Sequence, residues 1–445
     1  MESGDNVDDL KARTRDAVRE HYRSDPGYEW HRLERHRTEH AVTLRALADH
    51  LPAPPARVLD CGCGPGRYAI GLAKQGYEVT LFDLSPELLV MAQENAAEAG
   101  VSFSEVVEGT ATDLSCFDDA GFDAVLVMGP LYHLLDSDSR SQALVEASRV
   151  VKPGGPVLIA FISRYAGHIY GAAEDPNEAV DHPELYERVE QTGVLPPRDD
   201  GTGGFVAYFT HPSEIQPLCA DAGLNVDVLL GVEGLTSQRE EKINTLTGDA
   251  WQHWVDINYR IAHDPCILGG VEHLLAVCHR PKWRSVLAGL AERLAEANVD
   301  YRLVGGAALA AWGVDVEVRD LDFEMDKAAA YAFEEQFADA VVFPVAWRES
   351  DAVRSHYGRF EVDGVKVDVM AGLEWKIDGR WVPSLASTRA SVMVDGVAVL
   401  TLSLEEETLS CLRRGRLERA AAALPTCDEG RLLAILRQVS DLGWI

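Results

Sequence analysis

The most constraining feature of this chain is a glycine-rich turn between two apolar segments. The sequence reads VLDCGCGPG at Val58–Gly66, and EVTLFD follows at Glu78–Asp83. This pattern predicts a buried strand, a tight turn that opens a helix, and a second strand that ends in a carboxylate. Gly62, Gly64 and Gly66 lack Cβ atoms, so the turn can adopt positive φ and a ligand can approach its backbone closely.

The acids around this turn indicate what the ligand carries. Asp60 stands immediately before the turn, whose spacing is G-x-G-x-G. A carboxylate at that place attracts an ammonium group and repels the pyrophosphate of a dinucleotide. Asp83 ends the second strand, where a carboxylate accepts hydrogen bonds from both ribose hydroxyls of a nucleoside. We therefore expect a nucleoside ligand with an amino group, and a dinucleotide-binding domain is the alternative.

Three further motifs follow in order, at Gly109–Leu114, Asp123–Leu134 and Val150–Ile162. Together with the glycine turn they resemble the class I methyltransferases that use S-adenosylmethionine (SAM). In that family they correspond to the adenine-side loop, strand four with the substrate pocket, and the turn before strand five. The resemblance covers about residues 15–280. It implies a Rossmann-like α/β fold with a seven-stranded sheet whose last strand is antiparallel.

The same resemblance implies a set of functional residues. Asp60 and the three glycines would hold the methionine part of SAM, Asp83 the ribose, and Asp113 the adenine amine. Tyr132 and His133 leave strand four where the family places the methyl acceptor, so His133 is a candidate general base. Packing beneath a lid is the alternative for His133. The remaining implied cofactor contacts are Leu84, Thr112 and Met128.

The remaining organisation follows from periodicity and composition. Residues 9–51 have a helical pattern that ends at a proline-rich segment, which predicts an N-terminal helical lid over 1–56. Strand and helix patterns alternate through 57–280, interrupted by an aperiodic insertion at 163–204. A third segment, 281–445, begins with a new helix and strand, so we expect a separate domain there.

This third segment carries its own acidic motif. The strand expected at 301–307 ends at Gly305 and Gly306, and the sequence DLDFEMD begins at Asp320. Strand alternation places Asp320 and Asp322 on the same face, and Asp368 lies on a later alternating strand. Three carboxylates that converge in this way suit one or two Mg²⁺ ions.

Residues 281–445 thus resemble the nucleotidyltransferases of the DNA polymerase β superfamily, closest to the minimal and toxin-like branches. The resemblance implies a smaller α+β domain in which Asp320, Asp322 and Asp368 bind Mg²⁺ and Gly305 and Gly306 contact a nucleoside triphosphate. Ala307 is a departure, because many members carry a phosphate-contacting serine there. Glu324 and Asp326 extend the acidic face as solvated side chains would.

Charge and composition limit the partners. The 445 residues include 72 acidic and 41 basic side chains, for a net charge of −31. Such a surface argues against nucleic acid as a partner of the N-terminal domain and leaves it open for the C-terminal domain. The N-terminus shows no leader pattern, no apolar run approaches the roughly 20 residues of a membrane span, and the eight cysteines are scattered. We expect a cytoplasmic protein with a halophile-like surface and a small-molecule substrate.

The sequence leads to one main hypothesis and two alternatives. The main hypothesis is a SAM-dependent methyltransferase of a small molecule, fused to a nucleotidyltransferase-like domain. One alternative is a toxin-like nucleotidyltransferase that modifies RNA or protein, and the other is a SAM-binding regulator without turnover. The methyl acceptor itself is not readable from the sequence.

The net charge predicts that salt stabilises the protein. Repulsion among acidic side chains opposes the compact state, and salt at roughly 0.1 M screens it beyond about 10 Å. The melting temperature, followed by calorimetry, should therefore rise as KCl increases from dilute to molar concentration. A melting temperature independent of KCl would contradict the halophilic interpretation.

Overall fold

The computed structural model describes residues 4–24, 27–197, 205–377, 379–384 and 389–440. The chain divides into two compact units, Met1–Arg280 and Pro281–Ile445, and each is described by itself below. Among the helices described, none is both long and apolar enough to cross a membrane.

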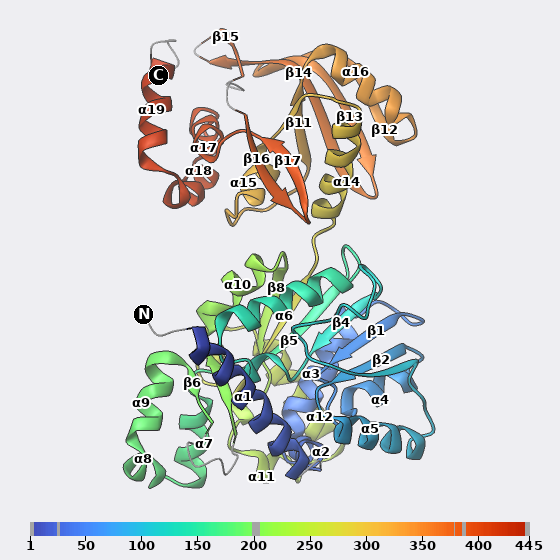
Figure 1. Ribbon diagram of the computed structural model, residues 1–445, viewed down its shortest axis with the longest axis vertical. Helices are drawn as coiled ribbons and strands as arrows, with labels where there is room; N and C mark the ends of the chain where they lie inside the picture. The colour runs from blue at the N-terminus through green and yellow to red at the C-terminus, as the bar shows by residue number, and fades with distance from the viewer. Residues whose placement is uncertain (1–3, 25–26, 198–204, 378, 385–388, 441–445) are drawn as a thin grey trace. The chain divides into compact units, whose positions relative to one another are not determined.

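A twisted sheet forms the centre of the first unit (Figure 1). Strands β3, β2, β1, β4 and β5 follow one another in parallel, and β9 then runs antiparallel to both β5 and β8. This is the expected seven-stranded arrangement, and a short hairpin of β6 and β7 extends it beside the end of β5. The strands are β1 (Arg57–Cys61), β2 (Glu78–Asp83), β3 (Glu105–Glu108), β4 (Ala124–Val127), β5 (Pro156–Ser163), β6 (Val194–Leu195), β7 (Ala207–Thr210), β8 (Asn225–Gly231) and β9 (His273–His279).

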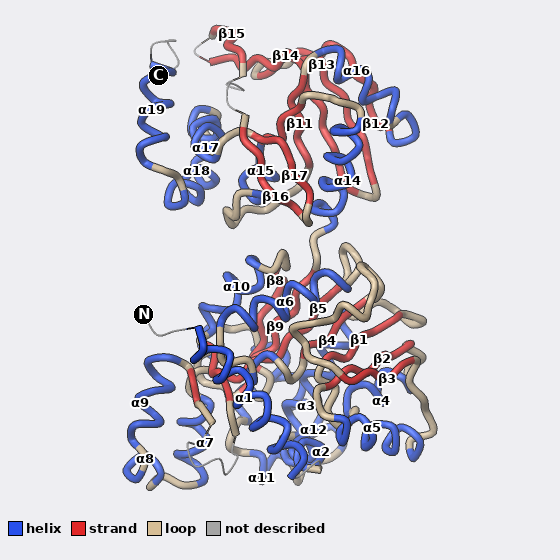
Figure 2. Tube along the Cα trace, viewed as in Figure 1, coloured by secondary structure: helices blue, strands red, loops and turns tan. Residues whose placement is uncertain are grey.

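Helices cover both faces of this sheet (Figure 2). One face packs against α3, α4, α5 and α12, and the other packs against α6 and α10. The strands are apolar on both faces because both are buried, as in other parallel sheets with crossover helices. The helices of this unit are α1 (Gly4–Ser24), α2 (Tyr28–Arg35), α3 (Arg37–His50), α4 (Arg67–Lys74), α5 (Pro86–Glu98), α6 (Ser137–Val150), α7 (Ala166–Glu174), α8 (Glu178–Asp181), α9 (Pro183–Thr192), α10 (Pro212–Asp221), α11 (Glu240–Ile243), α12 (Gly248–Ile261) and α13 (Pro265–Leu268).

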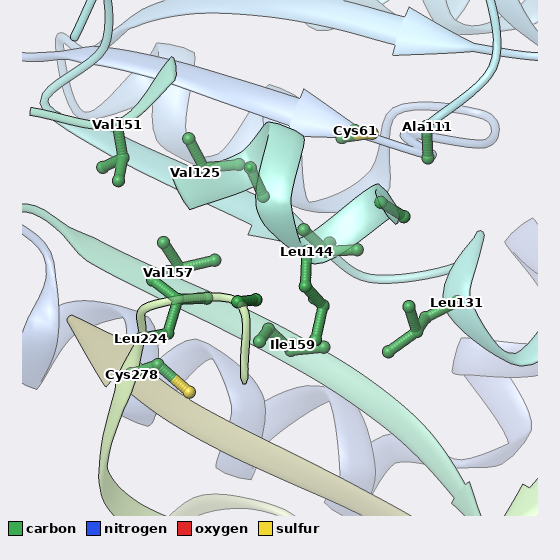
Figure 3. Packing of buried hydrophobic residues seen from close by; sticks show 14 of the residues in the cluster. Cys61, Ala111, Val125, Leu131, Leu144, Val151, Val157, Ile159, Leu224 and Cys278 are labelled. Carbon is green, nitrogen blue, oxygen red and sulfur yellow. The ribbon is translucent and has the colours of Figure 1, made fainter. Parts of the chain in front are cut away.

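The core beneath α6 and α10 shows how this packing positions the strands. Val125 of β4 and Val157 and Ile159 of β5 are fully buried against Leu144 of α6. Cys278 of β9 closes the same layer (Figure 3). Burial on both sides fixes the register of β4 and β5, and therefore the place where each strand ends.

Two expectations about this unit need correction. The described part of the N-terminal segment forms three helices, α1, α2 and α3, rather than one helical run, and His36 separates α2 from α3. The insertion at 163–204 is not irregular: its described part forms α7, α8, α9 and β6. Pro183 begins α9 and Gly193 ends it with φ 76°, so these punctuating residues bound short helices.

The second unit contains a mixed sheet in the order β12-β13-β14-β11-β10-β17-β16, with β15 paired to β14. Its strands are β10 (Tyr301–Val304), β11 (Leu321–Met325), β12 (Val341–Glu349), β13 (Val353–Val362), β14 (Val365–Ile377), β15 (Arg380–Pro383), β16 (Ala390–Val394) and β17 (Val397–Thr401). Its helices are α14 (Lys282–Glu296), α15 (Gly305–Ala311), α16 (Lys327–Gln336), α17 (Leu404–Arg413), α18 (Leu417–Ala423) and α19 (Glu429–Ser440).

Alternation along β11 and β14 separates core from site in this unit. Leu321 and Phe323 of β11, with Val367 and Val369 of β14, are fully buried in the core that includes α14 and α16. The residues between them project from the opposite face of the sheet. The acidic residues of both strands therefore lie away from α14 and α16.

Candidate functional site

A cavity of about 450 Å³ lies where β1, β2 and β4 end in the first unit. The carboxyl ends of parallel strands, at the point where the strand order reverses, are the usual ligand site of such sheets. The glycine turn after β1 lines one side of the cavity, and α1 and α2 line another. The cavity thus lies between the sheet and the N-terminal helices.

The glycine turn takes its shape from backbone contacts that a side chain would prevent. Gly62 has φ 78°, and a Cβ there would lie 2.2 Å from Cδ of Pro130. Its N–H donates to the carbonyl of Phe82 on β2, at 2.7 Å. Gly64 has open space where a Cβ would lie. Its φ of 52° is in the left-handed region, which favours glycine for a conformational reason. The turn therefore presents bare backbone toward the cavity.

Asp83 is bound to this turn. Its two carboxylate oxygens accept hydrogen bonds from the N–H groups of Gly64 and Ser85, each at 2.9 Å. Burial raises the pKa of Asp83, while these N–H groups act to lower it. A carboxylate oxygen accepts more than one hydrogen bond, so Asp83 can still accept bonds from a ligand's hydroxyls.

Asp60 has a different environment. Its side chain is 1% exposed, and neither carboxylate oxygen has a hydrogen-bond partner among the described residues. Burial, and then repulsion from Asp83, raises the pKa of Asp60 to about 7. An unpaired buried carboxylate is costly, and Asp60 lines the cavity. Its arrangement is complementary to a cationic ligand group.

Some of the other residues predicted to contact the cofactor line the cavity, and others do not. Leu84, Thr112 and Met128 line the cavity with the glycine turn. Gly66 does not; it has φ 82° and precedes α4, where a Cβ would lie 3.1 Å from Ala92. Asp113 does not line it either; it is exposed, and one of its oxygens accepts from the N–H of Ser115 at 3.0 Å. Its contact with adenine stays a prediction.

Tyr132 and His133 both line the cavity, on the short 3₁₀ helix η1 (Leu131–His133) that follows β4. His133 is 8% exposed, and both ring nitrogens have protein partners. Nε2 lies 2.8 Å from the Tyr22 hydroxyl, and Nδ1 lies 2.6 Å from the carbonyl of Val206. His133 is therefore held in one orientation, and Tyr22 stands beside the nitrogen nearest α1.

Sequence reasoning missed the contribution of α1 to the site. Thr14 and Tyr22 line the cavity, and the Thr14 hydroxyl is buried without a hydrogen-bond partner among the described residues. Thr14, Val18 and Tyr22 recur every four residues, so they share one face of the helix. That spacing was the available signal, because it marks the face that a lid helix turns inward.

A buried ion-pair network ties α3 to the sheet beside the cavity. Arg32 donates to both oxygens of Glu39 at 2.7 and 2.8 Å. His273 of β9 pairs with Glu233, and its Nδ1 lies 3.8 Å from Glu39 of α3. Burial raises the pKa of Glu39, but Arg32 and His273 outweigh it and hold the value at about 2. Burial lowers the pKa of His273, but Glu39 and Glu233 raise it to about 9. The positive charges of Arg32 and His273 balance the carboxylates of Glu39 and Glu233. We therefore interpret this cluster as structural.

The second unit brings its three predicted acids together. Asp322 of β11 is paired in register with Asp368 of β14. The ligand atoms of Asp320, Asp322 and Asp368 all lie within 4.8 Å of one another. Burial, and then repulsion from Asp320 and Asp368, raises the pKa of Asp322 to about 7. A Cβ at Gly305 would lie 2.6 Å from the Asp322 carboxylate, so this glycine permits the close approach.

Cationic side chains contact the same carboxylates. Arg359 donates to both oxygens of Asp368 at 2.7 and 2.9 Å, and the Tyr357 hydroxyl adds a third bond at 3.0 Å. Lys366 Nζ lies 2.7 Å from Asp320. The three carboxylates are the kind of ligand that a divalent cation prefers. Such an ion would compete with Lys366 for Asp320 and with Arg359 for Asp368.

Glu324 is not the solvated side chain that the sequence suggested. It is partly buried, and it accepts a hydrogen bond from the Ser384 hydroxyl at 2.8 Å. Burial raises its pKa to about 7. Asp326 instead caps α16, accepting from the N–H of Ala329 at 2.8 Å. The acidic face therefore continues inward from Asp322 to Glu324 and ends at Asp326.

Comparison with known proteins separates the two units. Residues 58–155 match a family model described as a methyltransferase domain, and residues 286–416 match one described as aminoglycoside-2''-adenylyltransferase. A ubiquinone biosynthesis O-methyltransferase of Paracidovorax citrulli is 32% identical over 211 residues, which are 47% of this chain and 77% of that protein. The chain belongs to the class I SAM-dependent methyltransferases.

Two other matches cover less of this chain. A ubiquinone biosynthesis O-methyltransferase of Xylella fastidiosa (strain 9a5c) is 36% identical over 124 residues, or 28% of this chain. The match spans about half of that relative, 48% of its length. A candidate nucleotidyltransferase of Thermotoga maritima is 31% identical, with 32% of this chain and 90% of that chain covered and a TM-score of 0.30.

Within this methyltransferase, the state of Asp60 gives a prediction about stability. Folding raises the carboxyl pKa from its usual value near 4 to about 7, so the folded state holds a proton that the unfolded state releases. The free energy of unfolding therefore falls as pH rises from about 4 through about 7. The loss attributable to Asp60 reaches at most about 4 kcal/mol.

We expect Asp60→Asn to raise the free energy of unfolding at pH 8 and to change it little at pH 4, measured by urea titration without ligand. Asp118→Asn, at an exposed position, is the matched control and should leave the pH dependence unchanged. A variant no more stable than the wild type at pH 8 would show that the Asp60 carboxylate is paired in solution.

Proposed function

We propose that the first unit transfers a methyl group from SAM to a small-molecule acceptor. The observation that carries this proposal is the buried Asp60 carboxylate, without a partner among the described residues, beside Asp83 in the cavity. Asp60 would bind the ammonium group of SAM, and Asp83 the ribose hydroxyls. Gly62 and Gly64 would allow the cofactor to lie against the backbone, with Leu84, Thr112 and Met128 beside it.

The acceptor would occupy the part of the cavity lined by Tyr132, His133 and α1. The names of the relatives support oxygen as the methylated atom, because those proteins are O-methyltransferases. SAM supplies an electrophilic methyl group, and alignment of the acceptor with it accounts for much of the rate in such displacements. The protein's part is to hold the acceptor in line, exclude water and accept the acceptor's proton.

A SAM-binding regulator is the alternative to a methyltransferase, and the cellular location and substrate class are further parts of the proposal. A regulator that binds SAM without turnover would share the pocket, and methyl transfer from labelled SAM to a component of a cell extract would eliminate it. The scattered cysteines support our proposal of a cytoplasmic location, and the acidic surface supports a small molecule rather than nucleic acid as substrate.

Binding of SAM can be tested at Asp83. We expect Asp83→Ala to weaken SAM by on the order of 1.5–3 kcal/mol, about 10- to 150-fold, because it removes hydrogen bonds to a charged group. Isothermal titration calorimetry measures this directly. Asp118→Ala is the matched control: its side chain is exposed and does not line the cavity, so its affinity for SAM should equal that of the wild type. Unchanged affinity in Asp83→Ala would refute the assignment of Asp83.

For the second unit we propose Mg²⁺-dependent nucleotidyl transfer. The convergence of Asp320, Asp322 and Asp368 supports this, as does the match of residues 286–416 to an adenylyltransferase model. Mg²⁺ held there would neutralise the phosphates of a nucleoside triphosphate lying against Gly305 and Gly306.

A toxin-like enzyme acting on RNA or protein is the alternative. A growth defect on expressing the full chain, absent in Asp322→Asn, would support that alternative.

A thermal-shift measurement tests the metal site. Mg²⁺ with ATP, CTP, GTP or UTP should raise the melting temperature of the full chain, since binding at 100 times the dissociation constant stabilises by about 2.7 kcal/mol. Asp322→Asn should abolish the shift, and Asp339→Asn, at an exposed position, should retain it. If none of the four nucleotides shifts the wild type, the proposed nucleotidyl transfer is wrong.

A further inference from the structure

The cavity of the first unit contains a hydrogen-bonded pair built from two distant segments. Tyr22 lies on α1 and His133 lies on η1, 111 residues apart in the sequence. The Tyr22 hydroxyl is 2.8 Å from Nε2 of His133, and the two rings meet edge to face with centroids 5.5 Å apart. Both side chains line the same cavity as Asp60 and the glycine turn.

The partner of the other ring nitrogen fixes the direction of this bond. His133 Nδ1 lies 2.6 Å from the carbonyl oxygen of Val206. A carbonyl can only accept, so Nδ1 carries the proton, and in a neutral ring Nε2 carries the lone pair. The Tyr22 hydroxyl must then donate to Nε2. The oxygen of a hydroxyl that donates its proton still has lone pairs with which to accept another hydrogen bond.

The surroundings keep the imidazole in this arrangement. His133 is 8% exposed and Val206 is 1% exposed. The rings of Tyr132 and Phe205 pack against the imidazole, with centroid distances of 4.7 and 5.6 Å. These contacts restrict rotation of the ring, so Nε2 stays directed toward α1. The chain thus provides a fixed proton acceptor behind the Tyr22 hydroxyl.

We propose that Tyr22 is a catalytic residue, whose hydroxyl contacts the methyl acceptor and passes the acceptor's proton to His133. The inference rests on the proposed methyltransferase function and assigns the step that removes the proton. The acceptor is a compound with a hydroxyl or amine that donates a hydrogen bond to Tyr22.

The step balances in atoms and charge. The acceptor's O–H or N–H donates to the Tyr22 oxygen, and the Tyr22 proton lies on the bond to Nε2. As the acceptor atom forms its bond to the methyl carbon, the bond between that carbon and sulfur breaks and its electron pair stays on sulfur. The acceptor's proton moves to Tyr22 while the Tyr22 proton moves to Nε2. The positive charge of the sulfonium is thereby replaced by that of the imidazolium, whose Nδ1–H still donates to Val206.

This assignment changes the role predicted for His133. His133 acts through Tyr22 rather than on the acceptor directly, so it is a positioning and proton-receiving residue. Because Tyr22 comes from α1, the pair exists only when α1 lies over the cavity. Acid–base chemistry is then coupled to the placement of the N-terminal helix.

The first test needs no acceptor. Nitrogen-15 NMR of histidine-labelled full chain at pH 7.5 should show His133 as the neutral tautomer with its proton on Nδ1. In Tyr22→Phe the Nε2 resonance should move, since its donor is lost, while in Tyr170→Phe it should stay. Tyr170 is 57% exposed, on α7. A proton on Nε2, or a cationic ring, in the wild type would overturn the proposal because Nε2 could not then accept from Tyr22.

The second test measures transfer of a radiolabelled methyl group from SAM to a fixed panel of phenols, catechols and primary amines. For any compound that the wild type methylates, Tyr22→Phe and His133→Asn should each lower kcat by about 10²–10⁴-fold. The double variant should be no slower than the slower single variant, since the two residues act as a unit. The dissociation constant of SAM should stay within about twofold in all three, whereas a purely structural role would weaken SAM binding along with kcat.

The possible outcomes distinguish failure of the Tyr22–His133 proposal from failure of the methyltransferase proposal. Wild-type kcat in Tyr22→Phe, with SAM bound normally, would refute the pair and leave the methyltransferase proposal intact. Failure of the wild type to bind SAM in calorimetry would refute the methyltransferase proposal itself. If the panel contains no compound that the wild type methylates, the NMR result alone decides whether the pair is correct.

Discussion

The first unit depends on keeping one unpaired carboxylate buried at the end of its central strand. Asp60 is 1% exposed and has no hydrogen-bond partner among the described residues, which costs stability in the absence of a ligand. The surrounding fold makes this possible: β1 is buried on both faces, and the glycine turn and α1 enclose its end. Packing around β1 therefore keeps the Asp60 side chain buried at the edge of the cavity.

The pairing of the buried acids separates structural groups from candidate ligand groups. Glu39 is neutralised by Arg32, and its pKa is about 2. Asp60 and Asp322 lack such a neutralising partner at close range, and the pKa of each is about 7. Carboxylates that retain a raised pKa in a cavity or on a site face are those that a cation would stabilise most. Asp60 and Asp322 both meet this criterion, and so does Glu324 on the same strand as Asp322.

Much of the site could be predicted because its residues follow local patterns. The motif at β1 and β2 predicted one site for Asp60, Asp83 and the glycines, since parallel neighbours end at the same edge of a sheet. Asp60, Asp83, Gly62 and Gly64 do line one cavity, and Gly66 does not. Alternation along β11 and β14 likewise predicted the convergence of Asp322 and Asp368. The role of Asp113 came from the resemblance alone, and its exposed carboxylate accepts from the N–H of Ser115. No periodicity in the sequence indicates which way a carboxylate in a loop points.

The sequence by itself determined the strands, the glycine turn and the faces on which the acids project, because these depend on periodicity and backbone freedom within short segments. Only the tertiary structure decided which distant groups meet. It brought Tyr22 of α1 to His133 and Val206, and it brought Lys366 of β14 to Asp320 of the second unit. Such contacts depend on how whole elements pack, and no local pattern in the chain records the partner of a side chain 111 residues away.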